Sequence, residues 1–156
     1  MKFMVDANVG RLATWLRIAG FDTLFINDLD DNRLVRIALS EGRVLLTKDT
    51  QILKRRLATT GRLKVIYIED NEVKAQLRQV VKTLNLASEV KPFTICLECN
   101  QPLEIRDKEE VKELVPPYVF KTQTQYMQCP ACQRVYWRGA HWGTMSRELE
   151  RIVSEG

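Results

Sequence analysis

Short apolar runs alternate with helix-like stretches along the first 90 residues. The runs that predict buried strands are residues 3–5, 23–26, 44–47 and 65–68. The stretches with apolar residues at helical spacing, which predict helices, are residues 10–19, 31–41, 50–58 and 72–86. Continuous apolar strands separated by helices are typical of a parallel sheet covered on both faces. We therefore predict an α/β domain with three layers over residues 1–90.

The pattern changes after Lys91-Pro92-Phe93, which we interpret as a junction between domains. Beyond it come four cysteines, a Pro-Pro pair and an alternating apolar and polar stretch over residues 119–127, which predicts β-structure. A short amphipathic helix is predicted over residues 144–153. We therefore predict a second, smaller domain over residues 91–156 that is rich in β-structure and ends in a helix.

The four cysteines form two C-x-x-C couples with 29 residues between them; they are Cys96, Cys99, Cys129 and Cys132. Two such couples complete a tetrahedral sulfur site for Zn²⁺. A disulfide framework is one alternative, but no signal peptide precedes the first strand. A redox C-x-x-C is another, but such a motif normally stands alone at the start of a helix. The spacing therefore favours a structural zinc site, and with it a zinc ribbon in residues 91–156.

Charge is unevenly distributed between the two predicted domains. Residues 1–90 hold 15 Lys and Arg against 11 Asp and Glu, whereas residues 91–156 hold nine of each. The net charge of +4 therefore lies on the first domain and favours a polyanionic partner, although an ordinary solvated surface fits the same totals. No apolar run approaches the roughly 20 residues that span a bilayer. We expect a soluble, cytoplasmic protein with no membrane partner.

Acidic residues follow every predicted strand of the first domain. In strand order they are Asp6; Asp28, Asp30 and Asp31; Asp49; and Glu69 with Asp70. Ligands of open α/β sheets bind outside the carboxyl ends of the strands, so these side chains are expected on one rim. Clustered carboxylates repel each other unless a cation neutralises them, and oxygen ligands suit Mg²⁺ or Mn²⁺. Such a metal site can activate water for phosphodiester hydrolysis.

A structural interpretation of the same acids is the alternative. Asp is a preferred helix N-cap, and Asp6, Asp30, Asp31 and Asp49 all come just before predicted helices. Asp28 fits an ordinary turn. For any single acid the cap or turn is the simpler explanation. The same chemistry at four strand ends favours a metal site.

Other catalytic machinery is largely missing from the sequence. His141 is the only histidine and lies in the cysteine-rich region, which excludes a Ser-His-Asp arrangement in the first domain. No Gly-rich phosphate loop occurs. A phosphatase of the haloacid dehalogenase type would carry a second acid at position 8, where this chain has Asn8. A small-molecule phosphatase therefore stays open as a weaker alternative.

Two groups of motifs resemble a known family. Residues 4–17 (MVDANVGRLATWLR) and 42–49 (GRVLLTKD) resemble the PIN-like nucleases. Residues 96–100 (CLECN), 115–119 (VPPYV) and 136–142 (YWRGAHW) extend the likeness to the Mut-seven C-terminal RNase family, a PIN-like domain followed by a zinc ribbon. The resemblance covers nearly the whole chain. It implies a metal-dependent RNase that uses acids at the strand ends.

The resemblance also implies which residues hold the catalytic metal. Asp6 and Asp49 are the firmest matches to the metal-binding acids of PIN-like domains, and would bind Mg²⁺ or Mn²⁺. The acid before the second helix falls within Asp28, Asp30 and Asp31, with the last two favoured. PIN-like proteins often pair, so the resemblance leaves open a homodimer or an association with a ribonucleoprotein.

Basic side chains near these acids are candidates for RNA contacts. Arg11 and Arg17 lie on the helix after the first strand, and Lys48 comes directly before an acid of the third, so each could hold phosphate. Arg11 is favoured because it is closest to the helix N-terminus. Arg138 and His141 follow the last cysteine couple and are candidate contacts to unpaired bases. The neighbouring Trp137 and Trp142 are expected to pack between the two domains.

Two functions of different classes therefore compete. The leading hypothesis is a ribonuclease in which a metal-activated water attacks the RNA phosphodiester at the acidic rim. The alternative is a non-catalytic module that binds RNA or a ribonucleoprotein, with the acids acting mostly as helix caps. Replacing Asp49 with Asn separates the two, because an enzyme would lose turnover and keep RNA affinity.

Overall fold

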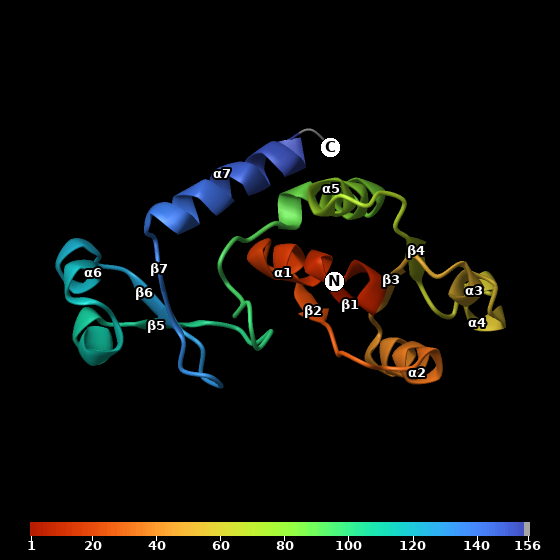
Figure 1. The fold of residues 1–156 in the computed structure, drawn as a ribbon, viewed down its shortest axis with the longest axis horizontal. Helices are drawn as coiled ribbons and strands as arrows, with labels where there is room; N and C mark the ends of the chain where they lie inside the picture. The colour runs from red at the N-terminus through yellow and green to blue at the C-terminus, as the bar shows by residue number, and fades with distance from the viewer. Residues whose placement is uncertain (155–156) are drawn as a thin grey trace.

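The computed structural model describes residues 1–154 as two sheets connected by a linker and by a long C-terminal helix, α7 (Ala140–Ser154) (Figure 1). The first sheet is parallel with strand order β2-β1-β3-β4, and the second is antiparallel with order β5-β6-β7. The strands are Lys2–Val5 (β1), Asp22–Leu24 (β2), Val44–Thr47 (β3), Val65–Tyr67 (β4), Glu104–Arg106 (β5), Tyr126–Gln128 (β6) and Val135–Trp137 (β7). The predicted α/β class with a parallel sheet is confirmed.

Helices cover both faces of the parallel sheet. Successive residues of its strands point to opposite faces, so the apolar strands need a buried cluster on each face. Phe3 and Val5 of β1 belong to one buried cluster, together with residues of α1 and α5. Met4 belongs to the other cluster, which it shares with residues of α2, α3 and α4. The helices are Arg11–Ile18 (α1), Asp31–Glu41 (α2), Thr50–Leu53 (α3), Arg56–Thr59 (α4) and Val73–Thr83 (α5). This is the predicted three-layer arrangement.

The second helix shows how local sequence fixes an element of this domain. Asp30 caps α2, because its side chain accepts a hydrogen bond from the N–H of Arg33 at 2.9 Å. Gly42 ends the helix in the left-handed conformation, with φ of 64°. The predicted bounds of this helix, and of the strand at Val44–Thr47, are therefore confirmed.

The prediction of one helix over residues 50–58 was wrong. The chain forms two single turns, α3 and α4, because Arg55 adopts an extended conformation with ψ of 145°. Ile52 and Leu57 both pack in the second buried cluster. In a continuous helix, residues five positions apart point about 140° away from each other, so the break lets both side chains reach the sheet.

The prediction of β-structure over residues 119–127 was wrong for its first half. Residues Pro117–Thr122 form a helix, α6, with Pro at its first position, and only Tyr126–Gln128 belongs to a strand. A 3₁₀ helix at Lys108–Leu114 precedes it. Val111, Val115 and Val119 pack with Tyr126 in a small core of their own. Val115 is extended between the 3₁₀ helix and α6, so these valines meet through the fold of the chain, and their packing outweighed the local alternation.

The C-terminal helix α7 packs on the first core, although the sequence assigns it to the second domain. It begins at Ala140, earlier than predicted, and lies along α5 (Figure 1). Leu149 and Ile152 enter the first buried cluster, and Lys74 of α5 forms an ion pair with Glu148 at 3.2 Å. This helix therefore connects the cysteine-rich sheet back to the parallel sheet.

The linker and the first cysteine turn dock on the edge of the parallel sheet. The N–H of Lys91 donates to the carbonyl oxygen of Ala19 at 2.9 Å. Gly20 permits this approach, because a Cβ there would collide with the carbonyl oxygen of Lys91. The side chain of Asn100 accepts from the N–H of Thr23 at 2.8 Å, so a residue of the cysteine turn pairs with edge strand β2.

Candidate active site and cysteine centre

Three carboxylates meet at the carboxyl edge of the parallel sheet. Asp6 follows β1, Asp49 lies two residues after the neighbouring strand β3, and Asp31 is the first residue of α2. One carboxylate oxygen from each lies within 4.8 Å of the others. We call Asp6, Asp31 and Asp49 the carboxylate triad. Three oxygen donors at this separation can share one divalent cation, and they suit Mg²⁺ or Mn²⁺.

Thr47, at the end of β3, fixes two members of the triad. Its buried hydroxyl donates to Oδ2 of Asp6 at 2.7 Å and accepts from the N–H of Asp49 at 2.9 Å. The hydroxyl therefore sets the orientation of one carboxylate and the backbone position of the other. Sequence reasoning did not single out this residue, although Thr47 lies in the Thr-Lys-Asp segment that carries the family resemblance.

Helix capping and membership of the triad are compatible. Asp49 caps α3 through Oδ1, which accepts from the N–H of Gln51 at 2.9 Å. Asp6 caps the short 3₁₀ turn Ala7–Val9 through its own Oδ1. Each cap bond occupies one carboxylate oxygen. The cap interpretation and the metal interpretation of these acids therefore apply together.

The pKa of Asp31 is raised by its place in the triad. Burial is the largest effect that raises the pKa of the Asp31 carboxyl. A hydrogen bond with Asp49 and repulsion from the charges of Asp49 and Asp6 raise this pKa further, and the positive charge of Arg55 lowers it. A carboxylate that holds its proton more tightly than usual is one whose charge is poorly compensated. A bound divalent cation would remove this repulsion. Arg55 was not identified from the sequence as part of this site.

We predict that Asp31→Asn stabilises the metal-free protein and removes its response to metal. The raised pKa means that stability falls as the pH rises through it, and Asn abolishes that loss. We expect a gain of about 0.5–1 kcal/mol near neutral pH, or roughly 1–4 °C in Tm. Mn²⁺ should raise the Tm of the native protein and leave the variant unchanged.

The matched control is Asp30→Asn. Asn is as good a helix cap as Asp, and Asp30 lies outside the triad. This variant should keep the Mn²⁺-dependent rise in Tm. An equal rise in Asp31→Asn and in the native protein would show that Asp31 does not hold the ion.

Several residues predicted for the site lie outside the triad. Among residues 1–154, the acidic group includes neither Asp28 nor Asp30. Asp28 is exposed and has a positive φ of 56°, as in a turn. Arg17 is turned toward the first cysteine turn, because its guanidinium donates to the carbonyl oxygens of Thr23 and Leu97. It therefore connects strand β2 of the parallel sheet to the first cysteine turn.

Two of the predicted phosphate contacts stay near the strand ends. Arg11 is exposed at the start of α1, five residues after Asp6. Lys48 lies between Thr47 and Asp49, and its ammonium group donates to the carbonyl oxygen of Glu69 at 3.2 Å. Both remain candidates for binding phosphate.

We predict that Thr47→Val weakens metal binding while preserving the fold. The change keeps the side-chain shape but leaves the N–H of Asp49 without its partner, at a cost of about 1–3 kcal/mol. Affinity for Mn²⁺ should fall by about 10–100-fold, as for other groups that orient metal ligands. Thr23→Val is the control, since Thr23 is equally buried in β2 and its hydroxyl donates only to the carbonyl oxygen of Phe21. It should lower Tm without changing Mn²⁺ affinity, and equal affinity loss in both variants would contradict the prediction.

The four cysteines converge on one point between their two turns. Their sulfur atoms lie within 4.8 Å of one another, and those of Cys96 and Cys132 are 3.7 Å apart. A tetrahedral zinc site with bonds of about 2.3 Å places its sulfurs roughly 3.8 Å apart. A disulfide would bring two sulfurs to about 2.05 Å. The cluster can therefore bind a metal such as zinc, and none of the four is in a disulfide.

The two cysteine turns have the same backbone design. The N–H of Asn100 donates to the carbonyl oxygen of Cys96, and the N–H of Gln133 donates to that of Cys129, both at 2.9 Å. Asn100 and Gln133 both have positive φ, of 60° and 67°. Each turn thus presents its two thiols to the same side.

Hydrogen bonds lower the pKa of the Cys96 thiol and so favour the thiolate that binds metal. Burial raises the pKa of its thiol, but hydrogen bonds from the Tyr136 hydroxyl and from the N–H groups of Cys99 and Glu98 outweigh this and lower the pKa to about 7. The Cys99 thiol shows the opposite effect, because its hydrogen bond with Cys132 raises the pKa to about 12. Metal ligation requires a thiolate, so a divalent cation bound at this cluster would release the proton of Cys99.

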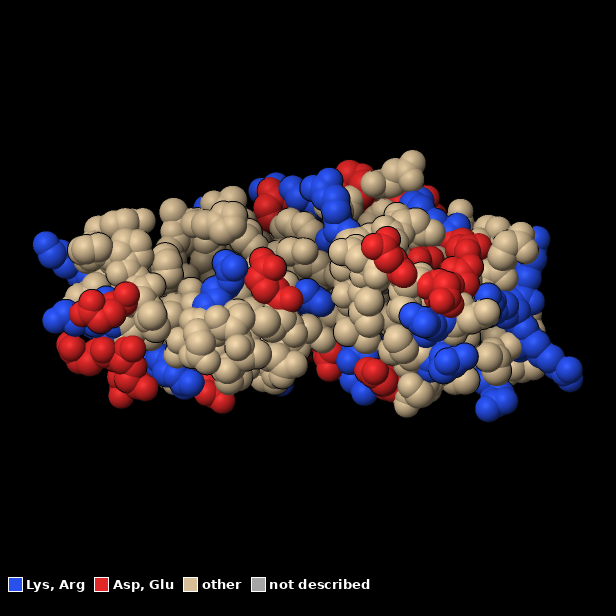
Figure 2. Space-filling model, turned by 60° about the horizontal axis from the view of Figure 1, so that its bottom comes forward, with Lys and Arg blue, Asp and Glu red and all other residues tan. Residues whose placement is uncertain are grey.

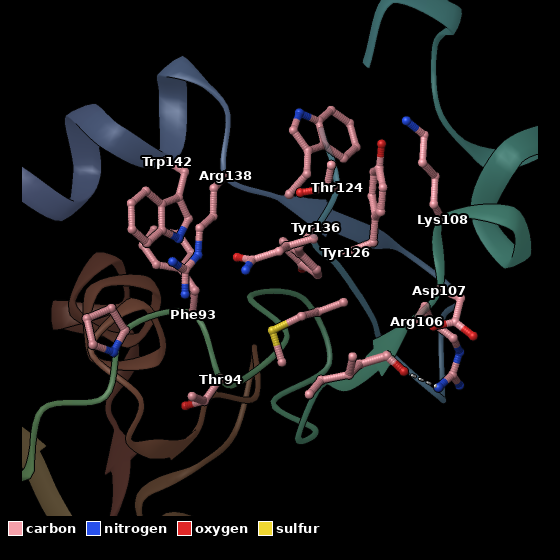
Figure 3. Close-up of a pocket in the computed structure, with 15 residues that line it drawn as sticks. Phe93, Thr94, Arg106, Asp107, Lys108, Thr124, Tyr126, Tyr136, Arg138 and Trp142 are labelled. Atoms are coloured by element: carbon pink, nitrogen blue, oxygen red, sulfur yellow. Dashed lines mark hydrogen bonds between the residues drawn. The ribbon is translucent and has the colours of Figure 1, made fainter. Parts of the chain in front are cut away.

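A groove of about 540 Å³ lies between the antiparallel sheet, the linker and the start of α7 (Figure 3). Phe93 of the linker packs against Trp142, with ring centroids 5.0 Å apart, and Arg138 lies over the Trp142 ring. Trp137 packs against the small core of the second domain. The expected packing between the domains is therefore observed for Trp142 against the linker, whereas Trp137 packs within the cysteine-rich region instead. His141 is exposed at the start of α7 and stays a candidate RNA contact.

The fold and its two clusters define a PIN-like α/β protein with an added four-cysteine β-module. The chain matches the family model described as the Mut7-C RNAse domain over residues 1–149, and it belongs to that family. No curated protein and no solved structure matches it. None of the helices in residues 1–154 has the length and apolarity that a membrane-spanning segment needs.

Proposed function

We propose that this protein is a metal-dependent ribonuclease and that the carboxylate triad holds its Mg²⁺ or Mn²⁺. The observation that carries the proposal is the convergence of Asp6, Asp31 and Asp49 from three separate parts of the chain to within 4.8 Å. Membership of the Mut7-C RNAse domain family supports RNA as the substrate. The metal would supply an activated water and neutralise charge on the phosphate.

The residues around the triad would orient its carboxylates and bind the RNA. Thr47 orients Asp6, and Lys48 and Arg11 would bind phosphate oxygens near the triad. A cation that contacts the phosphate stabilises the negative charge that grows during displacement. Arg138 and His141, on the second domain, would contact RNA beyond the scissile bond.

The cysteine cluster has a structural role in this proposal. Four sulfur ligands fill the coordination shell of Zn²⁺ and leave no open position for a substrate. We propose that zinc holds the two turns together and so keeps Asn100 and Leu97 docked on the first domain, at Thr23 and Arg17 respectively.

Substrate choice tests the proposed function. Metal-stripped protein is incubated with a labelled unstructured RNA, or with a phosphate monoester, in Mn²⁺, Mg²⁺ or EDTA. We expect RNA to be cleaved only when Mn²⁺ or Mg²⁺ is present. We expect the monoester not to be hydrolysed in preference to RNA. RNA binding without cleavage under every condition would favour the non-catalytic RNA-binding module. Release of phosphate from the monoester without action on RNA would favour a phosphatase.

A further inference from the structure

One segment next to the triad carries an unbalanced positive charge. Residues 50–68 contain five cations and no acid; the cations are Lys54, Arg55, Arg56, Arg62 and Lys64. We call these five residues the basic patch. Without them, residues 1–90 would hold ten basic residues against 11 acidic ones. The positive excess of the first domain therefore comes from this patch.

The patch is compact in space as well as in sequence. Its residues lie between α3 and α4, on α4 and in the turn that leads to β4, and these elements form one end of the molecule (Figure 1). In Figure 2, Lys and Arg side chains cover this end, and Asp and Glu side chains gather beside it. The basic surface therefore adjoins an acidic one.

The charges of the patch are not neutralised by ion pairs among residues 1–154. Lys54, Arg56, Arg62 and Lys64 are exposed, and none of the five patch residues forms an ion pair within residues 1–154. Uncompensated like charges on one surface repel each other, and a polyanion relieves this repulsion. The surface is thus suited to a row of phosphates rather than to internal packing.

Arg55 connects the patch to the triad. Its guanidinium donates to Oδ1 of Asn32 at 2.9 Å, and its charge acts on the neighbouring carboxylate of Asp31. Asp49 caps α3, the helix whose C-terminal residue is followed by Lys54. A strand of RNA that has one phosphate at the triad would pass directly onto α3 and α4.

We propose that the basic patch binds the sugar-phosphate backbone of the RNA on one side of the cleavage site. This inference rests on the proposed ribonuclease function and names a part of its substrate-binding surface. The patch contacts phosphates and not base edges, so it contributes affinity without sequence preference. RNA that is too short to reach the patch would lose this affinity.

The test compares two fourfold variants with the same change in charge. The patch variant is Lys54→Gln, Arg56→Gln, Arg62→Gln and Lys64→Gln, which keeps Arg55 because that residue contacts Asn32. The control variant is Lys82→Gln, Lys91→Gln, Lys121→Gln and Arg147→Gln, all of them exposed. Binding of a labelled 20-nucleotide unstructured RNA is measured by fluorescence anisotropy in EDTA, from 50 to 200 mM salt.

We expect the patch variant to bind RNA with a weaker dependence on salt. Each phosphate contact to single-stranded RNA contributes about 0.7 to the slope of log affinity against log salt, so four contacts contribute roughly 3. Between 50 and 200 mM salt, the native protein should therefore lose about 50-fold more affinity than the patch variant. The control variant should behave nearly as the native protein does. Equal flattening in both variants would overturn the proposal.

Cleavage kinetics separate this inference from the function on which it rests. With Mn²⁺ present, the patch variant should show a raised KM for the long RNA and an unchanged kcat, because backbone contacts act equally in ground and transition states. Cleavage of a dinucleotide should be unaffected. Unchanged KM and salt slope, with cleavage intact, would overturn the patch alone. A native protein that neither cleaves nor binds RNA would overturn the proposed function itself.

Discussion

Asp49→Asn is expected to reduce metal-dependent RNA cleavage by at least about 100-fold, with RNA affinity in EDTA unchanged. Asn keeps the cap bond to the N–H of Gln51, because its amide oxygen replaces Oδ1. It removes the negative charge through which the triad would hold a cation. The measurement is the single-turnover cleavage rate of a labelled RNA in saturating Mn²⁺.

Asp28→Asn is the control for that variant. Asp28 also follows a strand of the parallel sheet, but it lies outside the triad and has a positive φ that Asn tolerates well. We expect its cleavage rate to stay within a factor of about 3 of native, as for a surface change away from the chemistry. A loss in Asp28→Asn equal to that in Asp49→Asn would show that the ions are held by a different set of acids.

Cys99→Ser is expected to have the largest effect on stability. Structural zinc in small modules contributes about 10–16 kcal/mol of folding free energy, so losing one sulfur ligand should loosen residues 93–142. Zinc content should fall from one ion per chain toward zero. Hydrogen exchange should quicken at β6 and β7, and less so in the parallel sheet, which has its own buried clusters.

Chelation of the native protein provides the comparison for that variant. Removing zinc should reproduce the faster exchange of residues 93–142, and adding zinc back should reverse it. Unchanged zinc content together with unchanged melting in Cys99→Ser would contradict the structural zinc site.

The parallel sheet was predictable because its signals are local. Buried strands such as Val44–Thr47 are continuous apolar runs, and α2 has both a capping Asp30 and a terminating Gly42. The break at Arg55 was not predictable in this way. It depends on which side chains reach the sheet, and that is decided by tertiary packing rather than by helix propensity.

The region after the linker was predicted less well because it has little core of its own. Its cysteine spacing predicted one cluster, and the four sulfurs do converge. The helix at Pro117–Thr122 was missed, since the alternation of residues 119–127 was given more weight than the Pro-Pro pair, whose second proline begins the helix. In so small a core, a few contacts decide each element.

The acidic rim was predictable as a set but not residue by residue. Parallel strands bring their carboxyl ends to one edge, which predicted the set of acids, and the family resemblance then singled out Asp6 and Asp49. The sequence left Asp30 and Asp31 equivalent, and only the geometry of α2 separates the cap from the member of the triad. Thr47 acts through a buried hydroxyl, and a lone threonine in an apolar strand gives no such signal.

The most direct test is a Mn²⁺ titration of metal-stripped protein in which bound Mn²⁺ and RNA cleavage are measured on the same samples. Electron paramagnetic resonance reports the bound ion, and a labelled unstructured RNA reports cleavage. We predict that the cleavage rate rises in proportion to Mn²⁺ bound at the triad and is absent in EDTA. Cleavage in EDTA, or a fully occupied triad with no cleavage, would contradict a ribonuclease that works through these three carboxylates.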